Sequence, residues 1–86
     1  MTKREVDFQD ELRGLLTNAQ ECGFVAVEIR AGELHRRVGD YPGSDHRMPL
    51  CCSAMKKAMN EADSIIDAPR KGVGASLTIR YVLPRG

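Results

Sequence analysis

The chain has 86 residues, of which 42% are hydrophobic and 29% are charged, and its net charge is +1. These values are typical of one small globular domain over residues 1–86, and they exclude most enzymes that need a deep, walled pocket. No apolar stretch approaches the roughly 20 residues that cross a bilayer, and the N-terminus has no apolar secretory segment. We therefore expect a cytoplasmic protein without a membrane partner.

Two helices and one strand are predicted before residue 40. Apolar residues at three- and four-residue steps predict a first helix over residues 7–22. Residues 25–30 alternate with the two-residue period of a half-buried strand, and residues 31–39 return to helical spacing. The residues expected to face the core are Phe8, Leu12, Leu15, Leu16 and Ala19 in the first helix, Val25, Val27 and Ile29 in the strand, and Ala31, Leu34 and Val38 in the second helix.

A third helix is expected to follow a turn-rich loop over residues 39–45. It should begin near Pro49, because proline is favoured at the first helical position. At about 100° per residue, residues 50–60 separate into an apolar and a polar side. The apolar side carries Leu50, Cys51, Ala54, Met55, Ala58 and Met59, with Cys52 at its margin. The polar side carries Ser53, Lys56, Lys57 and Asn60.

The C-terminal part of the chain predicts a β-hairpin. Ile65 and Ile66 mark the first strand, residues 67–74 form the connection, and residues 77–83 alternate as the return strand. The element order is helix, strand, helix, helix, strand, strand, which is an α+β arrangement. This order resembles that of winged helix-turn-helix domains, in which three helices form the core and a short first strand joins the hairpin.

The winged-helix resemblance implies double-stranded DNA as the partner. In such domains the second of the paired helices docks in the major groove, and the hairpin loop contacts the adjacent backbone. The residues placed at the groove are Ser53, Lys56, Lys57 and Asn60, and those placed on phosphates are Arg47, Arg70 and Lys71. The predicted connection over residues 39–48 is longer than a compact helix-turn-helix allows, so this loop could itself be a contact surface.

The charge pattern sets the expected strength of such binding. Residues 1–43 carry six Lys or Arg and eight Asp or Glu, whereas residues 44–86 carry seven and four, which places the basic excess in the C-terminal half. Two or three basic contacts give only weak, salt-sensitive affinity. Specific binding is therefore expected to need a homodimer or a larger partner.

Three segments are also similar to a family of small uncharacterised bacterial and phage proteins. They are Glu33–Gly39, His46–Cys52 with Met55 beyond it, and Gly72–Tyr81. The similarity covers roughly residues 24–85, and related segments are associated with standalone proteins and with DNA-processing or restriction neighbourhoods. This resemblance implies a nucleic-acid role in bacteria and assigns no role to an individual residue.

For the cysteines and histidines, the sequence predicts structural roles rather than metal binding or catalysis. His35, His46, Cys51 and Cys52 could in principle bind zinc, but adjacent cysteines in a helix point about 100° apart. A nucleophilic Cys51 or Cys52 needs a lowered pKa and an oriented base, and no third orienting group is evident near His46. We therefore expect no cofactor, no metal and no catalytic residue, with His35 at the edge of the second helix.

A protein-interaction adaptor on the same scaffold is the alternative function, because a fold does not fix a function. The near-neutral net charge suits that role. So does the acidic start of the first helix, which carries Glu5, Asp7, Asp10 and Glu11. One continuous positive face would favour DNA, and a mixture of charges would favour a protein partner.

Overall fold

The computed structural model describes residues 4–39, 48–70 and 74–84. Within these ranges it contains three helices and a three-stranded antiparallel sheet, in the order expected from the sequence. The elements are α1 (Glu5–Glu21), β1 (Ala26–Arg30), α2 (Ala31–Val38), α3 (Met48–Lys57), β2 (Ser64–Asp67) and β3 (Thr78–Val82). The predicted α+β class is therefore confirmed. None of the described helices has the length and apolar character needed to cross a membrane.

Helix α1 begins at Glu5 rather than at the expected residue 7, because its first turn is closed by a reciprocal cap. The Asp7 carboxylate accepts the Arg4 backbone N–H at 2.8 Å, and the Asp7 N–H donates to the Arg4 carbonyl at 3.0 Å. Carboxylates in a first helical turn also interact favourably with the helix dipole. The buried stripe is the expected one, with Phe8, Leu12 and Leu16.

The sheet has the strand order β1-β3-β2, so the last strand in the chain lies in the middle. Ile29 pairs with Ile79 and Val27 pairs with Tyr81, and these side chains face the helices. Glu28 pairs with Arg80 on the opposite face, which is open to solvent. The alternation of each strand thus sends one set of side chains to the core and one to solvent.

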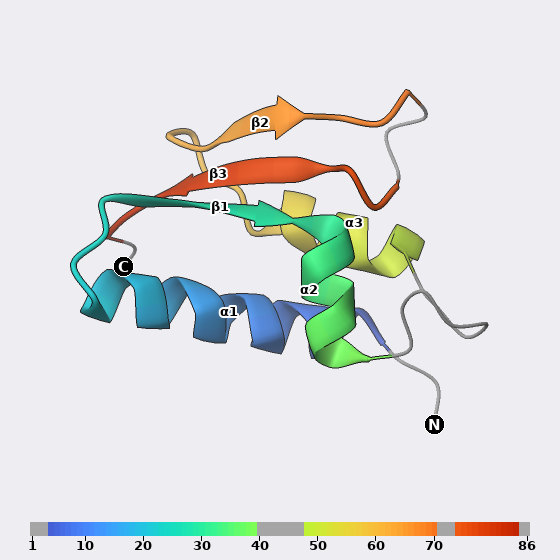
Figure 1. The fold of residues 1–86 in the computed structure, drawn as a ribbon, viewed down its shortest axis with the longest axis horizontal. Helices are drawn as coiled ribbons and strands as arrows, with labels where there is room; N and C mark the ends of the chain where they lie inside the picture. The colour runs from blue at the N-terminus through green and yellow to red at the C-terminus, as the bar shows by residue number, and fades with distance from the viewer. Residues whose placement is uncertain (1–3, 40–47, 71–73, 85–86) are drawn as a thin grey trace.

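The helices cover one face of the sheet and enclose the core. In Figure 1, α1 runs below β1, and α2 and α3 lie at the end of the molecule where α1 begins. Helix α1 packs against both α2 and α3. The fully buried side chains with the largest volume are Tyr81, Phe8, Leu12, Leu34, Met55, Leu77, Ile79, His35, Cys51 and Cys52.

Tyr81 joins the sheet to the end of α3. Its hydroxyl is buried and donates to the Met55 carbonyl at 2.8 Å. The last carbonyls of a helix have no helical backbone N–H four residues later in the chain to donate to them. Here the Met59 N–H donates to the Lys56 carbonyl at 3.2 Å instead of to that of Met55. A side chain of β3 therefore supplies the hydrogen bond that the end of α3 lacks.

Two predicted positions in the first half of the chain are wrong in burial. Val25, expected on the inner face of the first strand, precedes β1 and is 75% exposed, next to Phe24 at 61%. His35, expected at the edge of the second helix, is fully buried, and its ring meets that of Phe8 edge to face at 4.9 Å. α2 packs against both α1 and α3, so the side of the helix that carries His35 is covered.

Candidate nucleic-acid interface

Helix α3 has the buried and exposed sides that its sequence predicts. Cys51, Ala54 and Met55 are buried, whereas Lys56 and Lys57 are exposed and Ser53 is half-buried. The helix therefore brings together three of the predicted groove residues on one surface. A shallow depression of about 350 Å³ lies on this surface, lined by Pro49, Cys52, Ser53, Lys56 and Lys57.

A carboxylate from α1 reaches this surface. Glu5 Oε1 lies 2.7 Å from Lys57 Nζ, and the Ser53 hydroxyl donates to Glu5 Oε2 at 3.3 Å. Gln9 Nε2 donates to the same carboxylate from one turn along α1, at 3.2 Å. The hydrogen bond from Lys57 is the main cause that holds the pKa of Glu5 below its ordinary value of 4.5.

Sequence reasoning missed this contact between Glu5 and α3. It placed Glu5 among the acidic residues of the first helix, as a feature that would suit a protein partner. Ser53 is 48 positions away from Glu5, so no helical or strand spacing relates the two. The packing of the start of α1 against α3 brings them together, and the acidic character of residue 5 was the one available signal.

Asn60, expected on the polar side of the third helix, lies beyond its end. Helix α3 stops at Lys57, and Asn60 takes part in the turn that leads to β2. Its backbone N–H donates to Asp63 Oδ2 at 2.8 Å, and its side-chain oxygen accepts the Ala62 N–H at 2.9 Å. Asn and Asp commonly close turns in this way, which ends the helical pattern early.

The remaining predicted contacts lie around the connection of the hairpin and before α3. Arg70 is exposed at the start of the connection between β2 and β3. Figure 1 shows the described residues on either side of this connection at the end of the molecule where α3 begins. Arg47 and Lys71 lie outside the described residues. The described part of the predicted interface therefore consists of Ser53, Lys56 and Lys57 on α3 and Arg70 on the hairpin, with Asn60 in the turn after α3.

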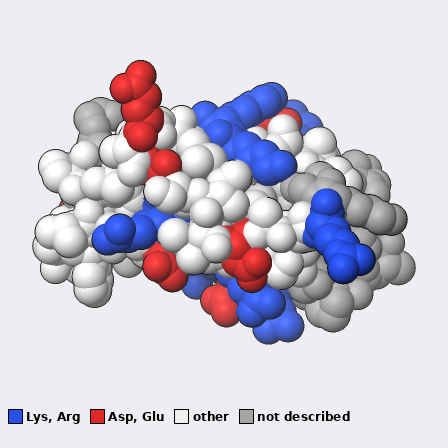
Figure 2. All heavy atoms as spheres, turned by 90° about the horizontal axis from the view of Figure 1, so that it is seen from above, with Lys and Arg blue, Asp and Glu red and all other residues white. Residues whose placement is uncertain are grey.

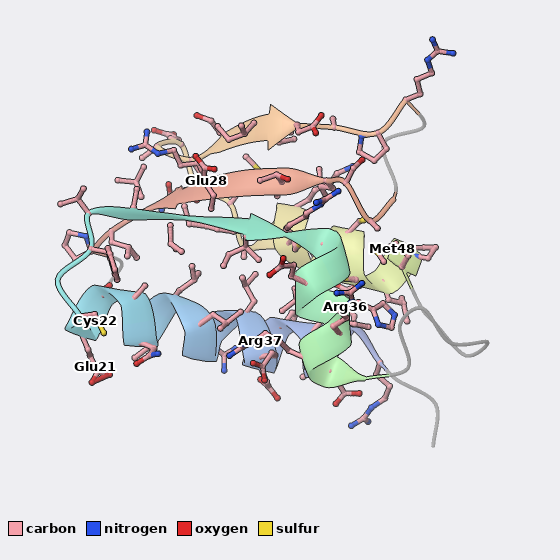
Figure 3. The ribbon with its side chains drawn as sticks, viewed as in Figure 1. Glu21, Cys22, Glu28, Arg36, Arg37 and Met48 are labelled. Carbon is pink, nitrogen blue, oxygen red and sulfur yellow. The ribbon has the colours of Figure 1, made fainter. Side chains whose placement is uncertain are left out.

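Charges of both signs are mixed over the face that carries β2. Figure 2 shows Lys and Arg side chains interspersed with Asp and Glu on this face. Glu28 and Arg80 are neighbours on the open side of the sheet, as their pairing requires. Ion pairs also join elements elsewhere: Arg37 Nε on α2 lies 3.1 Å from Glu11 Oε2 on α1, and Figure 3 shows Arg37 between these helices.

Cys51 and Cys52 are core residues with separate partners. The Cys51 thiol donates to the Ala31 carbonyl at 3.4 Å, and the Cys52 thiol donates to the Gly74 carbonyl at 3.5 Å. Burial, with a smaller contribution from Cys52, raises the pKa of Cys51 to about 12, so this thiol is a poor nucleophile at neutral pH. These hydrogen bonds connect the start of α3 to the start of α2 and to the segment that precedes β3.

The described residues hold no cluster of three or more potential metal ligands. His46 of the zinc hypothesis lies outside the described residues. Figure 3 places Cys22 at the far end of α1 from Met48, the first residue of α3, so Cys22 is remote from the other two cysteines.

Comparison of the chain with protein-family models, with curated proteins and with solved structures finds no match. Function is therefore inferred from the chemistry of α3 and its surroundings. The polar groups on the exposed side of that helix are two ammonium groups and one hydroxyl, which are donors of the kind that bind an anionic ligand.

Proposed function

We propose that this chain is a winged-helix module that binds double-stranded DNA. The observation that carries the proposal is the sheet order β1-β3-β2, with β1 placed between α1 and α2. This connectivity supports a winged-helix arrangement, in which α3 is the recognition helix and the connection between β2 and β3 is the wing. Fold alone does not assign a function, so the chemistry of α3 must carry the choice of ligand.

The exposed side of α3 offers donors to a DNA backbone. Lys56 and Lys57 are exposed near its C-terminal end, and the Ser53 hydroxyl lies one turn before Lys57. Ammonium and hydroxyl groups contact phosphate oxygens and base edges in protein–DNA complexes. Arg70 at the start of the wing supplies a further cation for the adjacent backbone.

Binding by one copy of the module is expected to be weak and dependent on salt. Each phosphate that a cation neutralises contributes about 0.9 to the slope of log K against log salt. Three cations on α3 and the wing therefore predict a slope of about −3, far from that of a high-affinity repressor. Specific recognition would then need a second copy, which doubles the number of contacts, or a larger partner that adds its own contacts.

The test is a fluorescence-anisotropy titration of a labelled duplex at about 50 and 200 mM salt. The variant Lys56→Gln/Lys57→Gln should weaken binding and reduce the salt slope by about 2. The matched control is Arg13→Gln/Arg80→Gln, which removes the same charge from α1 and from the open face of the sheet. No binding at about 50 mM salt, or equal effects of the two double variants, would overturn the proposal.

A protein-interaction adaptor is the second candidate, and exposed apolar side chains favour it. Phe24 and Val25 precede β1, and Ile65 and Ile66 lie in β2, an edge strand whose residues are all exposed. Edge strands of this kind can pair with another chain. The mixed charges of Figure 2 also suit a protein partner. This candidate predicts a protein that ignores duplex DNA even at low salt and gains a partner through β2.

A further inference from the structure

The carboxylate of Glu5 is bound by the α3 surface in the manner of an anionic ligand. Its two oxygens are divided between two donors from successive turns of that helix, Lys57 Nζ at 2.7 Å and Ser53 Oγ at 3.3 Å. A phosphodiester group likewise presents two acceptor oxygens and one negative charge. The donors that hold Glu5 are therefore chemically suited to a backbone phosphate of DNA.

Glu5 is held in place from its own helix. It is the first residue of α1, so its backbone is fixed by the reciprocal cap between Arg4 and Asp7. Gln9 donates to its carboxylate at 3.2 Å from the next turn. The Glu5 side chain is only 24% exposed, whereas Lys57 is 64% exposed. Lys57 can therefore turn towards solvent more freely than Glu5 can.

We propose that Glu5 occupies the position of a DNA phosphate on α3 and is displaced from Lys57 and Ser53 when duplex DNA binds. This inference rests on the proposed function, since it describes the regulation of the same surface. Glu5 lowers the affinity of the module in two ways. It neutralises the cation that would contact the backbone, and its negative charge repels the approaching phosphate.

The size of the effect follows from the exposure of the pair. An ion pair with a largely exposed partner shifts an equilibrium by up to about fivefold at moderate salt. Glu5→Gln should therefore tighten duplex binding by about two- to fivefold at 50 mM salt. Because salt screens the ion pair between Glu5 and Lys57, this gain should shrink at about 200 mM salt, so the salt slope of the variant should be slightly steeper.

Glu11→Gln provides the matched control. Glu11 lies on the same helix and pairs with Arg37 of α2 at 3.1 Å, so its removal changes the net charge equally while leaving α3 untouched. The glutamine at position 5 can still accept the Ser53 hydroxyl, which limits the disturbance of packing. Thermal unfolding of both variants followed by circular dichroism checks that the fold is kept.

The decisive experiment measures the affinity of each variant for the labelled duplex, once with Lys57 present and once with Lys57 replaced by Gln. The inference predicts that Glu5→Gln tightens binding more than Glu11→Gln does, and that this gain disappears when Lys57 is also replaced by Gln. Equal gains for Glu5→Gln and Glu11→Gln would overturn the role of Glu5 and leave DNA binding intact. Absence of binding by every variant at 50 mM salt would overturn both.

Discussion

Replacement of Tyr81 by Phe tests whether a side chain of β3 completes the end of α3. The substitution removes one oxygen atom and leaves the ring, so it creates almost no cavity. What it removes is the hydrogen bond to the Met55 carbonyl, at 2.8 Å in the core. That carbonyl cannot recover a helical donor easily, because the Met59 N–H donates to Lys56. The change therefore leaves a buried acceptor unpaired.

The magnitude follows from the cost of an unpaired buried group. Loss of one partner in a buried pair costs about 1–3 kcal/mol, so we expect a loss of about 2 kcal/mol in the free energy of unfolding. For a chain of this length the thermal midpoint should then fall by about 8–16 °C. A domain of this size has a total stability of only about 4–13 kcal/mol, so the loss is a substantial fraction.

Urea unfolding followed by far-ultraviolet circular dichroism measures this change. The midpoint should fall while the dependence on urea stays constant, because the exposed surface of the unfolded chain is unaltered. Thr78→Val is the control, since its hydroxyl donates to the half-buried Ser76 carbonyl at 3.0 Å and its loss should cost less than about 0.5 kcal/mol. A Tyr81→Phe variant as stable as the unmodified chain would refute the capping role.

Two further perturbations test other parts of the structure. Asp63→Ala should lower the free energy of unfolding by about 1–3 kcal/mol in the same urea assay. The reason is that the Asp63 carboxylate accepts the Val82 N–H at 2.8 Å and also the Asn60 N–H. An unchanged urea midpoint would contradict this. In the folded chain iodoacetamide should label exposed Cys22 quickly and buried Cys51 only after unfolding, as mass spectrometry of peptides would show. The pKa of Cys51 is raised from 9.0 to about 12, so the folded state keeps a proton that the unfolded chain releases. The contribution of the protonated Cys51 thiol to the free energy of unfolding is complete below pH 9 and is lost as the pH rises towards 12. Cys51→Ala should therefore make the loss of stability between these pH values shallower.

The sequence predicted the elements well because each one carries its own periodicity. The three- and four-residue steps of α1 and the alternation of β3 are local patterns, and both appear in the structure. The end of α3 was placed too late, since Asn60 and Asp63 form a turn whose hydrogen bonds override the helical spacing. Cys52 was expected at the margin of the apolar side and is buried, because its thiol meets the Gly74 carbonyl.

Only the part of the candidate site that lies on α3 could be predicted from the sequence. The spacing within α3 sets Ser53, Lys56 and Lys57 on one surface, which required no knowledge of the rest of the chain. The Glu5 carboxylate on that surface could not be predicted in this way, because the contact depends on how α1 and α3 pack. Burial of His35 was missed for the same reason, since its cover comes from Phe8 on another helix.

The central position of β3 has a consequence for synthesis on the ribosome. Ala26 in β1 pairs with Val82, which is made 56 residues later, and β2 also pairs only with β3. Until β3 has emerged, neither earlier strand has a partner, and the apolar faces of the nascent chain remain uncovered. Co-translational folding of this domain is therefore confined to its helices, and the sheet closes as a single late event.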